Sequence, residues 1–532
     1  MTSATVFTHA RIYARVNQPP TSGGIAVQDG KVIAVGDLDH CRAAAGADAA
    51  TVALSGAAVF PGFHDAHIHT GALALQFDAP DVSEATSLTE ALALLARWAD
   101  AHPGDGWVVG GRWDANEWGE GETLHRELLD EIFGDRPVVL NTVDAHSVCA
   151  SSRALEIAGI TADTEAAPGS VIERDADGQL NGILRENASD SIRAIANRQL
   201  LADAADLLAG VQRHLHARGI TAITDFDGEE VRQGFTALAA AGKLRLRVRK
   251  GIPMGELDRA IAEGRTSGDG DDWLITGPVK LFSDGALGSH TALMHEGYEG
   301  DRCNCGVEVI SVPNLTETVE RANSNGIAVA THAIGDRANT NVLDAYEATK
   351  DCTRANDLHN SIEHAQHLAP RDIERFYELQ VTASMQPIHC TGDFPLSVNL
   401  LGERDTLHYP WCTLRKAGVR VAFGSDGPIE PVEPMYGIHA AVTRQRRDNE
   451  PAGGREPSER LPLDQALLAY TEAPASMDER EAVRGRIEPG AYADFVALNA
   501  DPYDTHPADL WKLGVTETIV AGEPVYRTEG AA

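Results

Sequence analysis

Short apolar runs separated by turn residues occupy both ends of the chain. Residues 1–60 contain several such runs, and Asp29-Gly30 between two of them favours a hairpin because both residues tolerate a positive φ. The same pattern returns in residues 481–532. It predicts β-rich segments at the two ends, which we expect to form one small discontinuous β-sandwich domain with the termini close together.

Strand-like apolar runs alternate with helix-like segments in the middle of the chain, residues 61–480. This alternation favours parallel β/α units, and polar residues follow many of the runs directly. That layout is typical of a (β/α)8 barrel, in which the chemistry lies at the carboxyl ends of the strands. The predicted fold class is therefore α/β, a TIM-like (β/α)8 barrel with a small β-sandwich domain built from both chain ends. The expected strands include residues 138–140, 220–224, 246–248, 279–282, 327–330, 360–363, 381–383 and 419–423.

The stretch from about residue 73 to 215 is too long for a single connection between barrel elements. It contains a helical pattern over residues 88–101, a tryptophan-rich segment over 106–114 and many turn residues over 166–182. We predict an insertion after the first barrel strand that forms part of a substrate wall or a cap.

Charge and hydropathy narrow the functional classes. The formal net charge is −34, with 79 acidic residues against 45 Lys and Arg. Such a surface repels nucleic acid and anionic membranes and favours solubility where salt screens self-repulsion. We therefore predict a salt-tolerant or halophilic source, with an ordinary acidic bacterial protein as the alternative. No apolar run is long enough to span a bilayer, and the N-terminus lacks a signal pattern, which predicts a cytoplasmic protein.

The first candidate metal ligands are in His67-Ile68-His69. In an extended chain His67 and His69 point to the same side, as the first two ligands of a divalent ion require. A His-x-His pair is common on its own, so the interpretation depends on later signals. The first of these later signals is Lys280, which lies inside an apolar strand-like run. The others are His332, His364 and Asp426, each just past such a run. This ordered set at barrel-strand ends predicts a metal site.

The motifs around these residues resemble the amidohydrolase superfamily and, more narrowly, the YtcJ-like group (amidohydrolase family 3), which includes the N-substituted formamide deformylases. The resemblance covers nearly the whole chain. It rests on residues 61–69, 280–289, 331–336, 362–364, 424–428 and 490–494. One departure is His290, where the group leads us to expect arginine, and this position is expected to tune substrate choice.

The resemblance implies one or two bound divalent ions, with zinc as the expected metal. The implied ligands and their neighbouring carboxylate are His67, His69, His332, His364 and Asp426. Lys280 matches a lysine that the superfamily often carboxylates to bridge two metals, and burial in an apolar strand favours the neutral amine that carbamate formation needs. The alternative for Lys280 is an ion pair with Asp284, so the number of metals stays open.

The expected mechanism is hydrolysis by a metal-activated water. A metal lowers the pKa of its water and polarises the scissile carbonyl. Asp426 accepts the water proton and passes it to the leaving nitrogen, as general base and then acid, and His332 is the second catalytic candidate. The competing interpretation of Asp426 is a helix N-cap beside Gly427-Pro428.

Six residues are predicted to contact the substrate. His146 lies in a segment that resembles an Asp-Gly-His motif of the group, although a lone histidine is also typical of a packed polar residue. Trp113 has the same structural alternative, because a tryptophan in such a loop is usually packed. The full set is His146, Trp113, Asp114, Arg185, Asp284 and His290.

The predicted function is that of a metal-dependent amidohydrolase that cleaves a non-peptide carbon–nitrogen bond in a small linear amide, such as an N-substituted formamide. One alternative is a cyclic-amide hydrolase or a ring-deaminating aminohydrolase, but the His-x-x-Glu acid typical of ring deaminases is not apparent. The other is a non-catalytic barrel scaffold, against which the retained metal-facing residues argue. We expect a homodimer, because large barrels often pair, and no nucleic-acid or membrane partner.

Overall fold

The computed structural model divides into two units along the chain. One unit joins Met1–Thr70 with Ala209–Ala532, and the other is Gly71–Leu208. The structure describes residues 4–77, 79–115, 118–119, 121–142, 147–166, 170–185, 187–201, 204–477 and 480–528. Among these residues, no helix combines the length and the apolar character needed to cross a membrane.

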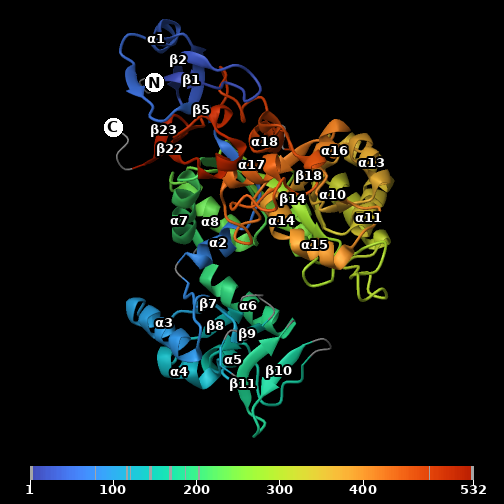
Figure 1. The fold of residues 1–532 in the computed structure, drawn as a ribbon. Coiled ribbons are helices and arrows are strands. Elements are labelled where there is room, and N and C mark those ends of the chain that lie inside the picture. Colours follow the sequence, from blue (N-terminus) through green and yellow to red (C-terminus); the bar gives the residue numbers. More distant parts are fainter. Residues whose placement is uncertain are drawn as a thin grey trace. The chain divides into compact units, whose positions relative to one another are not determined.

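The two ends of the chain share one sheet in the first unit, where the blue and red strands of Figure 1 meet. Its strands run in the order β23-β22-β21-β5-β1-β2-β3, with β4 paired to β1. Asp29 and Gly30 form the predicted turn between β2 and β3, with φ of 50° and 75°. This confirms a small β domain built from both chain ends. Its strands are β1 (Thr5–Ile12), β2 (Thr21–Gln28), β3 (Lys31–Gly36), β4 (Ala50–Ala53), β5 (Ala58–Pro61), β21 (Phe495–Leu498), β22 (Val515–Val520) and β23 (Glu523–Arg527).

The barrel lies in the same unit. Its eight strands are parallel neighbours in the order β6-β12-β13-β14-β15-β16-β18-β20, and a parallel bridge between Ile68 and Gly427 brings the last strand back to the first. The predicted (β/α)8 barrel is therefore confirmed. Its strands are β6 (Phe63–Ile68), β12 (Ile220–Asp225), β13 (Arg247–Pro253), β14 (Leu274–Phe282), β15 (Val329–Ala333), β16 (Ser361–His364), β18 (Thr382–Met385) and β20 (Val421–Phe423).

Helices follow the barrel strands in sequence, and a two-stranded sheet of β17 (His367–Leu368) and β19 (Leu407–His408) lies among them. The helices of the first unit are α1 (Leu38–Ala45), α8 (Glu229–Ala240), α9 (Leu257–Ala262), α10 (Val312–Ser324), α11 (Asp336–Ala348), α12 (Lys350–Ala355), α13 (Ile373–Glu378), α14 (Pro387–Gly392), α15 (Phe394–Leu401), α16 (Trp411–Lys416), α17 (Pro434–Thr443), α18 (Leu463–Ala469) and α19 (Glu472–Ala475). Short 3-10 helices are η3 (Met254–Glu256), η4 (Pro370–Asp372), η5 (Pro457–Glu459), η6 (Pro502–Asp504) and η7 (Pro507–Lys512).

The second unit has a sheet of its own, in the order β10-β11-β9-β8-β7. The expected strand at residues 138–140 lies here as part of β8, which pairs with β7 and β9 and not with the barrel. An apolar run predicts a buried strand but does not determine which sheet will bury it. The strands are β7 (Val108–Trp113), β8 (Val138–Thr142), β9 (Ser147–Ala150), β10 (Val171–Arg174) and β11 (Leu180–Arg185). The helices are α3 (Leu88–Ala101), α4 (Arg126–Phe133), α5 (Ser152–Ile157) and α6 (Asn187–Leu200), while α2 (Thr70–Gln76) and α7 (Ala204–His216) span the unit boundaries.

A buried ion pair joins the barrel to the terminal β domain. The Arg247 guanidinium, in β13, donates to both carboxylate oxygens of Asp494, which directly precedes β21. The exposed fractions of their side chains are 3% and 9%, and the Tyr492 ring centroid lies 3.7 Å from the guanidinium carbon. Arginine suits this position because its planar group pairs with a carboxylate and stacks on an aromatic ring at once.

Replacing Arg247 by Ala is expected to destabilise the protein by about 3–5 kcal/mol, because it leaves Asp494 buried and without its cation. Thermal unfolding measured by calorimetry checks this. Arg302→Ala is the control. Arg302 also pairs with a carboxylate, that of Glu299, but both side chains are exposed, and no measurable change is expected. Equal melting temperatures for both variants would contradict the structural role of Arg247.

Candidate metal centre

Two histidines lie at the carboxyl end of the first barrel strand, β6, which is buried along its whole length. His67 Nδ1 donates to Glu363 Oε2 over 2.6 Å, and His69 Nδ1 donates to Asp227 Oδ1 over 3.0 Å. Because an ionised carboxylate can only accept, these bonds place a proton on Nδ1 and direct Nε2 inward. Both Nε2 atoms lie 3.4 Å from Asp426 Oδ1.

Two more histidines belong to the same group. His364 ends β16, and its Nδ1 lies 2.8 Å from Oε1 of Gln386. His389 lies in α14, the helix that follows β18. Its Nδ1 donates to Glu430 Oε1 over 2.9 Å, and its Nε2 is 3.3 Å from Asp426 Oδ2. The arrangement of His67 and His69 therefore recurs at His389, with a carboxylate at Nδ1 and Nε2 directed to Asp426, and His364 shares the oxygen partner at Nδ1.

Asp426 is the common member of two ligand sets. The ligand atoms of His67, His69 and Asp426 lie within 4.8 Å of one another, and so do those of His364, His389 and Asp426. The backbone N–H of Asp426 donates to the His67 carbonyl over 2.7 Å, and its φ of 56° is not helical. Its predicted alternative role as a helix N-cap is wrong, because the next helix, α17, has another residue at its N-cap.

His332 and Lys280 lie next to these sets. His332 Nε2 lies 3.1 Å from the Gly285 carbonyl oxygen, and its ring centroid is 4.5 Å from that of His364. Lys280 is buried in β14, and within the described part of the chain its Nζ has no hydrogen-bond partner. Asp284 accepts three backbone N–H groups instead of pairing with Lys280. The ion-pair alternative for Lys280 is therefore wrong among the residues described.

Burial and charge set the protonation of the group. Burial lowers the pKa of Lys280 to about 8, which increases the fraction of the amine that is neutral near pH 7. Burial alone would raise the pKa of Asp426, but the facing histidines, His67 foremost, hold that pKa well below its usual range. Burial also opposes protonation of His69 and His389, yet hydrogen bonds to their carboxylate partners raise the pKa of each to about 10. The carboxylates around His69 and His389 thus favour a positive charge, either a proton or a metal ion, between their ring nitrogens and Asp426.

The residues fit a divalent metal ion. His67 Nε2 is buried and, among the described residues, has no hydrogen-bond partner, although it faces the Asp426 carboxylate. Imidazole nitrogens with a carboxylate oxygen are a donor set that zinc and neighbouring metals accept. A cation bound between His67 Nε2 and the Asp426 carboxylate would give each of these groups a partner.

Two predicted substrate contacts of the first unit lie in or beside the segment that follows β14. Asp284 is buried, and burial raises its pKa to about 7 against the effect of its three backbone bonds. Its Oδ1 lies 3.6 Å from His332 Nε2, so Asp284 braces the loops around that histidine. His290 is exposed, with φ of 56°, and its ring stacks on Tyr298 at 5.3 Å between centroids. A substrate contact by either residue stays a prediction.

The other predicted substrate contacts belong to the second unit. Trp113 is buried in that unit's core, where its indole N–H donates to the Leu140 carbonyl. Arg185 is exposed and pairs with Glu173. Asp114 is partly buried. His146 lies outside the described residues, so its contact with a substrate stays a prediction, as do those of the other three.

Several polar partners of the centre were not predicted from the sequence. His389 and Glu430 lie on segments after the last two barrel strands, and Glu363 directly precedes His364. The signal in the sequence that could have indicated these residues is a polar residue in or shortly after an apolar strand-like run. Because His389 lies four residues beyond the end of β18, strand periodicity does not predict where it points.

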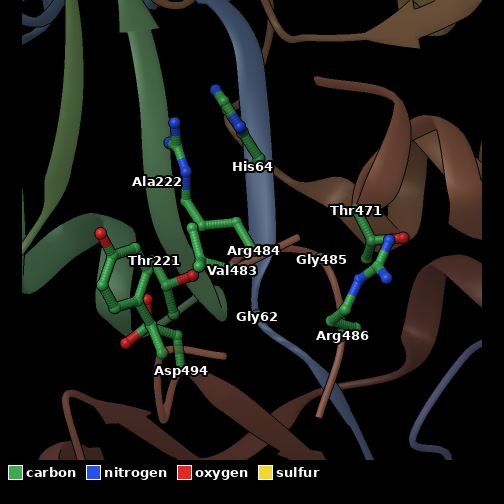
Figure 2. Close-up of a pocket in the computed structure, with 11 residues that line it drawn as sticks. Gly62, His64, Thr221, Ala222, Thr471, Val483, Arg484, Gly485, Arg486 and Asp494 are labelled. Atoms are coloured by element: carbon green, nitrogen blue, oxygen red, sulfur yellow. The ribbon is translucent and has the colours of Figure 1, made fainter. Parts of the chain in front are cut away.

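A separate hollow lies at the opposite ends of the barrel strands, near the starts of β6 and β12 (Figure 2). In Figure 2 the Arg484 side chain extends toward the level of the His64 imidazole, while Arg486 lies beside Thr471. None of the metal-centre residues lines this hollow. In barrels the chemistry lies at the carboxyl ends of the strands, so the hollow is not the candidate site.

Known proteins resemble this chain along almost its whole length. A model of the Amidohydrolase family matches residues 50–526. The chain is 32% identical over 526 residues to YtcJ of Bacillus subtilis (strain 168), whose name describes an amidohydrolase, covering 97% of this chain and 98% of that protein. It is 29% identical over 523 residues to the N-substituted formamide deformylase of Arthrobacter pascens, with 95% of each chain covered.

The crystal structure of an uncharacterized metal-dependent hydrolase from Pyrococcus furiosus has the same fold. The TM-score is 0.81 at 28% identity, and the match covers 94% of this chain and 99% of that one. The chain therefore belongs to the amidohydrolase family and is a hydrolase that acts on carbon–nitrogen bonds.

Proposed function

We propose that this enzyme hydrolyses a linear amide, such as an N-substituted formamide, at a centre of one or two divalent ions. The observation that carries the proposal is the convergence of imidazole nitrogens on the buried Asp426 carboxylate. Similarity to the Arthrobacter pascens formamide deformylase supports the substrate class. Zinc is the metal we propose, because it suits a site rich in imidazole.

The ligands of the first ion would be His67, His69 and Asp426. His364 and His332 would contribute to a second ion, and we propose a carboxylated Lys280 as the bridge between the two. The absence of a hydrogen-bond partner at Lys280 Nζ, within the described residues, supports this role. When bound, such ions lower the pKa of a water molecule and polarise the amide carbonyl.

Asp426 would carry the proton in this reaction. Its carboxylate, kept ionised by the facing histidines, accepts a proton from the attacking water and then passes it to the leaving nitrogen. Glu363 and Asp227 fix the orientation of the His67 and His69 rings through Nδ1. His332 is the second catalytic candidate, and its bond to the Gly285 carbonyl holds the ring in place.

A substrate panel combined with elemental analysis tests the proposal. We expect zinc in the purified protein and faster turnover of N-substituted formamides than of cyclic imides or ring amines. Turnover confined to cyclic imides or ring amines would replace the linear-amide proposal by the corresponding alternative. A folded protein with no metal and no metal-stimulated turnover would favour the scaffold.

The remaining predictions from sequence concern the protein's surroundings. A cytoplasmic location, a salt-tolerant source and a homodimer stay predictions. The prediction of a salt-tolerant source rests on the net charge of −34.

A further inference from the structure

We propose that His389 is a metal ligand and that Asp426 bridges two ions, one on its Oδ1 side with His67 and His69, the other on its Oδ2 side with His364 and His389. This inference rests on the proposed function, because it assigns a further ligand to the same centre. Nothing in the sequence pattern around His389 marks it as a ligand, and the assignment comes from the contacts of its ring.

The first argument is the way the His389 ring is held. Nδ1 donates to the Glu430 carboxylate over 2.9 Å, as Nδ1 of His67 donates to Glu363 and that of His69 to Asp227. A carboxylate at one ring nitrogen fixes the tautomer and raises the basicity of the other, which is the usual support for a metal-bound histidine. The exposed fraction of the His389 side chain is 9%, so the ring is also shielded from water.

The second argument is where the other nitrogen points. His389 Nε2 lies 3.3 Å from Asp426 Oδ2, while His67 and His69 Nε2 each lie 3.4 Å from Asp426 Oδ1. The two oxygens of one carboxylate therefore face separate groups of nitrogens. His364, whose Nδ1 faces the Gln386 amide oxygen, has a ligand atom within 4.8 Å of those of His389 and Asp426, so we group it with His389. One carboxylate with donors on both sides is the geometry of a bridging ligand.

The third argument is charge. The nitrogens of His67, His69 and His389 contact four buried or mostly buried carboxylates: Asp227, Glu363, Asp426 and Glu430. A single divalent ion supplies two of the four positive charges that these carboxylates require at a depth where unpaired charge is costly, and the other two would have to come from protons on the histidines and Lys280. Two divalent ions supply all four positive charges and leave the histidines neutral, the form in which an imidazole nitrogen can bind a metal.

The experiment measures zinc per chain in the wild type and in His389→Gln after equilibration with excess zinc and desalting. We expect two ions in the wild type and one in the variant. Because the variant could fail to fold, Glu430→Gln provides a second measurement: it keeps every ligand but is expected to weaken the affinity for the second ion by about 10–100-fold in a competitive chelator titration.

His367→Gln is the matched control. His367 is buried like His389, but its Nδ1 faces His408 and no carboxylate, and its nitrogens lie in neither ligand set, so two ions are expected. Two ions in a folded His389→Gln, or wild-type zinc affinity in Glu430→Gln, would overturn the role of His389. A single ion in the wild type would overturn it while leaving the proposed function standing, whereas no ion would overturn both.

Discussion

Asp426→Asn is expected to lower kcat/KM for a linear amide by about 10³-fold or more, because it removes the group that accepts and returns the proton. The amide keeps one acceptor oxygen but has no negative charge to share with the facing histidines. Both the proton transfer and the hold on the metal should therefore weaken. Steady-state kinetics and elemental analysis on the same preparation check both parts.

Asp509→Asn provides the comparison for this variant. Asp509 is an exposed aspartate paired with Lys512 on the surface, so activity and metal content should match the wild type. If Asp426→Asn retained turnover within tenfold of the wild type, Asp426 could not be the proton carrier, even if the metal stayed bound.

Removing the metal with a chelator is expected to abolish turnover and to lower the melting temperature by several degrees. An ion present at about 1,000 times its Kd stabilises the native state by about 4 kcal/mol, because the unfolded chain does not hold these ligands together. The affinity for the metal should also fall as the pH is lowered, because protons compete with the metal for the imidazole nitrogens. Scanning calorimetry with and without chelator measures the shift.

Adding zinc back is the control for that experiment, since restored activity shows that the chelator did not damage the protein. Unchanged activity in a sample shown by elemental analysis to contain no metal would rule out the metal-dependent mechanism.

The sequence predicted the parts of the centre that strand ends determine. Apolar runs locate β15, β16 and β20, and the His-x-His pair marks the end of β6. Barrel topology brings these carboxyl ends to one rim, so the residues at those ends could be grouped from the sequence alone. The turn at Asp29-Gly30 was predictable for a similar reason, because its conformation depends on local φ preferences.

Contacts that depend on tertiary packing could not be predicted in this way. His389 lies on a short helix beyond its strand, and only the chain path after β18 brings its ring to Asp426. Asp284 was a candidate ion-pair partner for Lys280, four residues before it in the sequence. In the structure, the Asp284 carboxylate oxygens accept backbone N–H groups of Leu293 and Ile334 instead. Residues 138–140 form a strand as expected, but periodicity does not say which sheet a strand joins.

The pairing of β5 with β21 has a consequence for synthesis on the ribosome. β5, the strand that leads directly into β6, lies between β1 and β21, and it meets the second of these partners only when residues 495–498 have been translated. The barrel closes only after β20. During most of translation the nascent chain therefore carries apolar strands with unpaired edges, which are prone to association. Chaperone dependence during expression, and aggregation of C-terminally truncated chains, follow from this order.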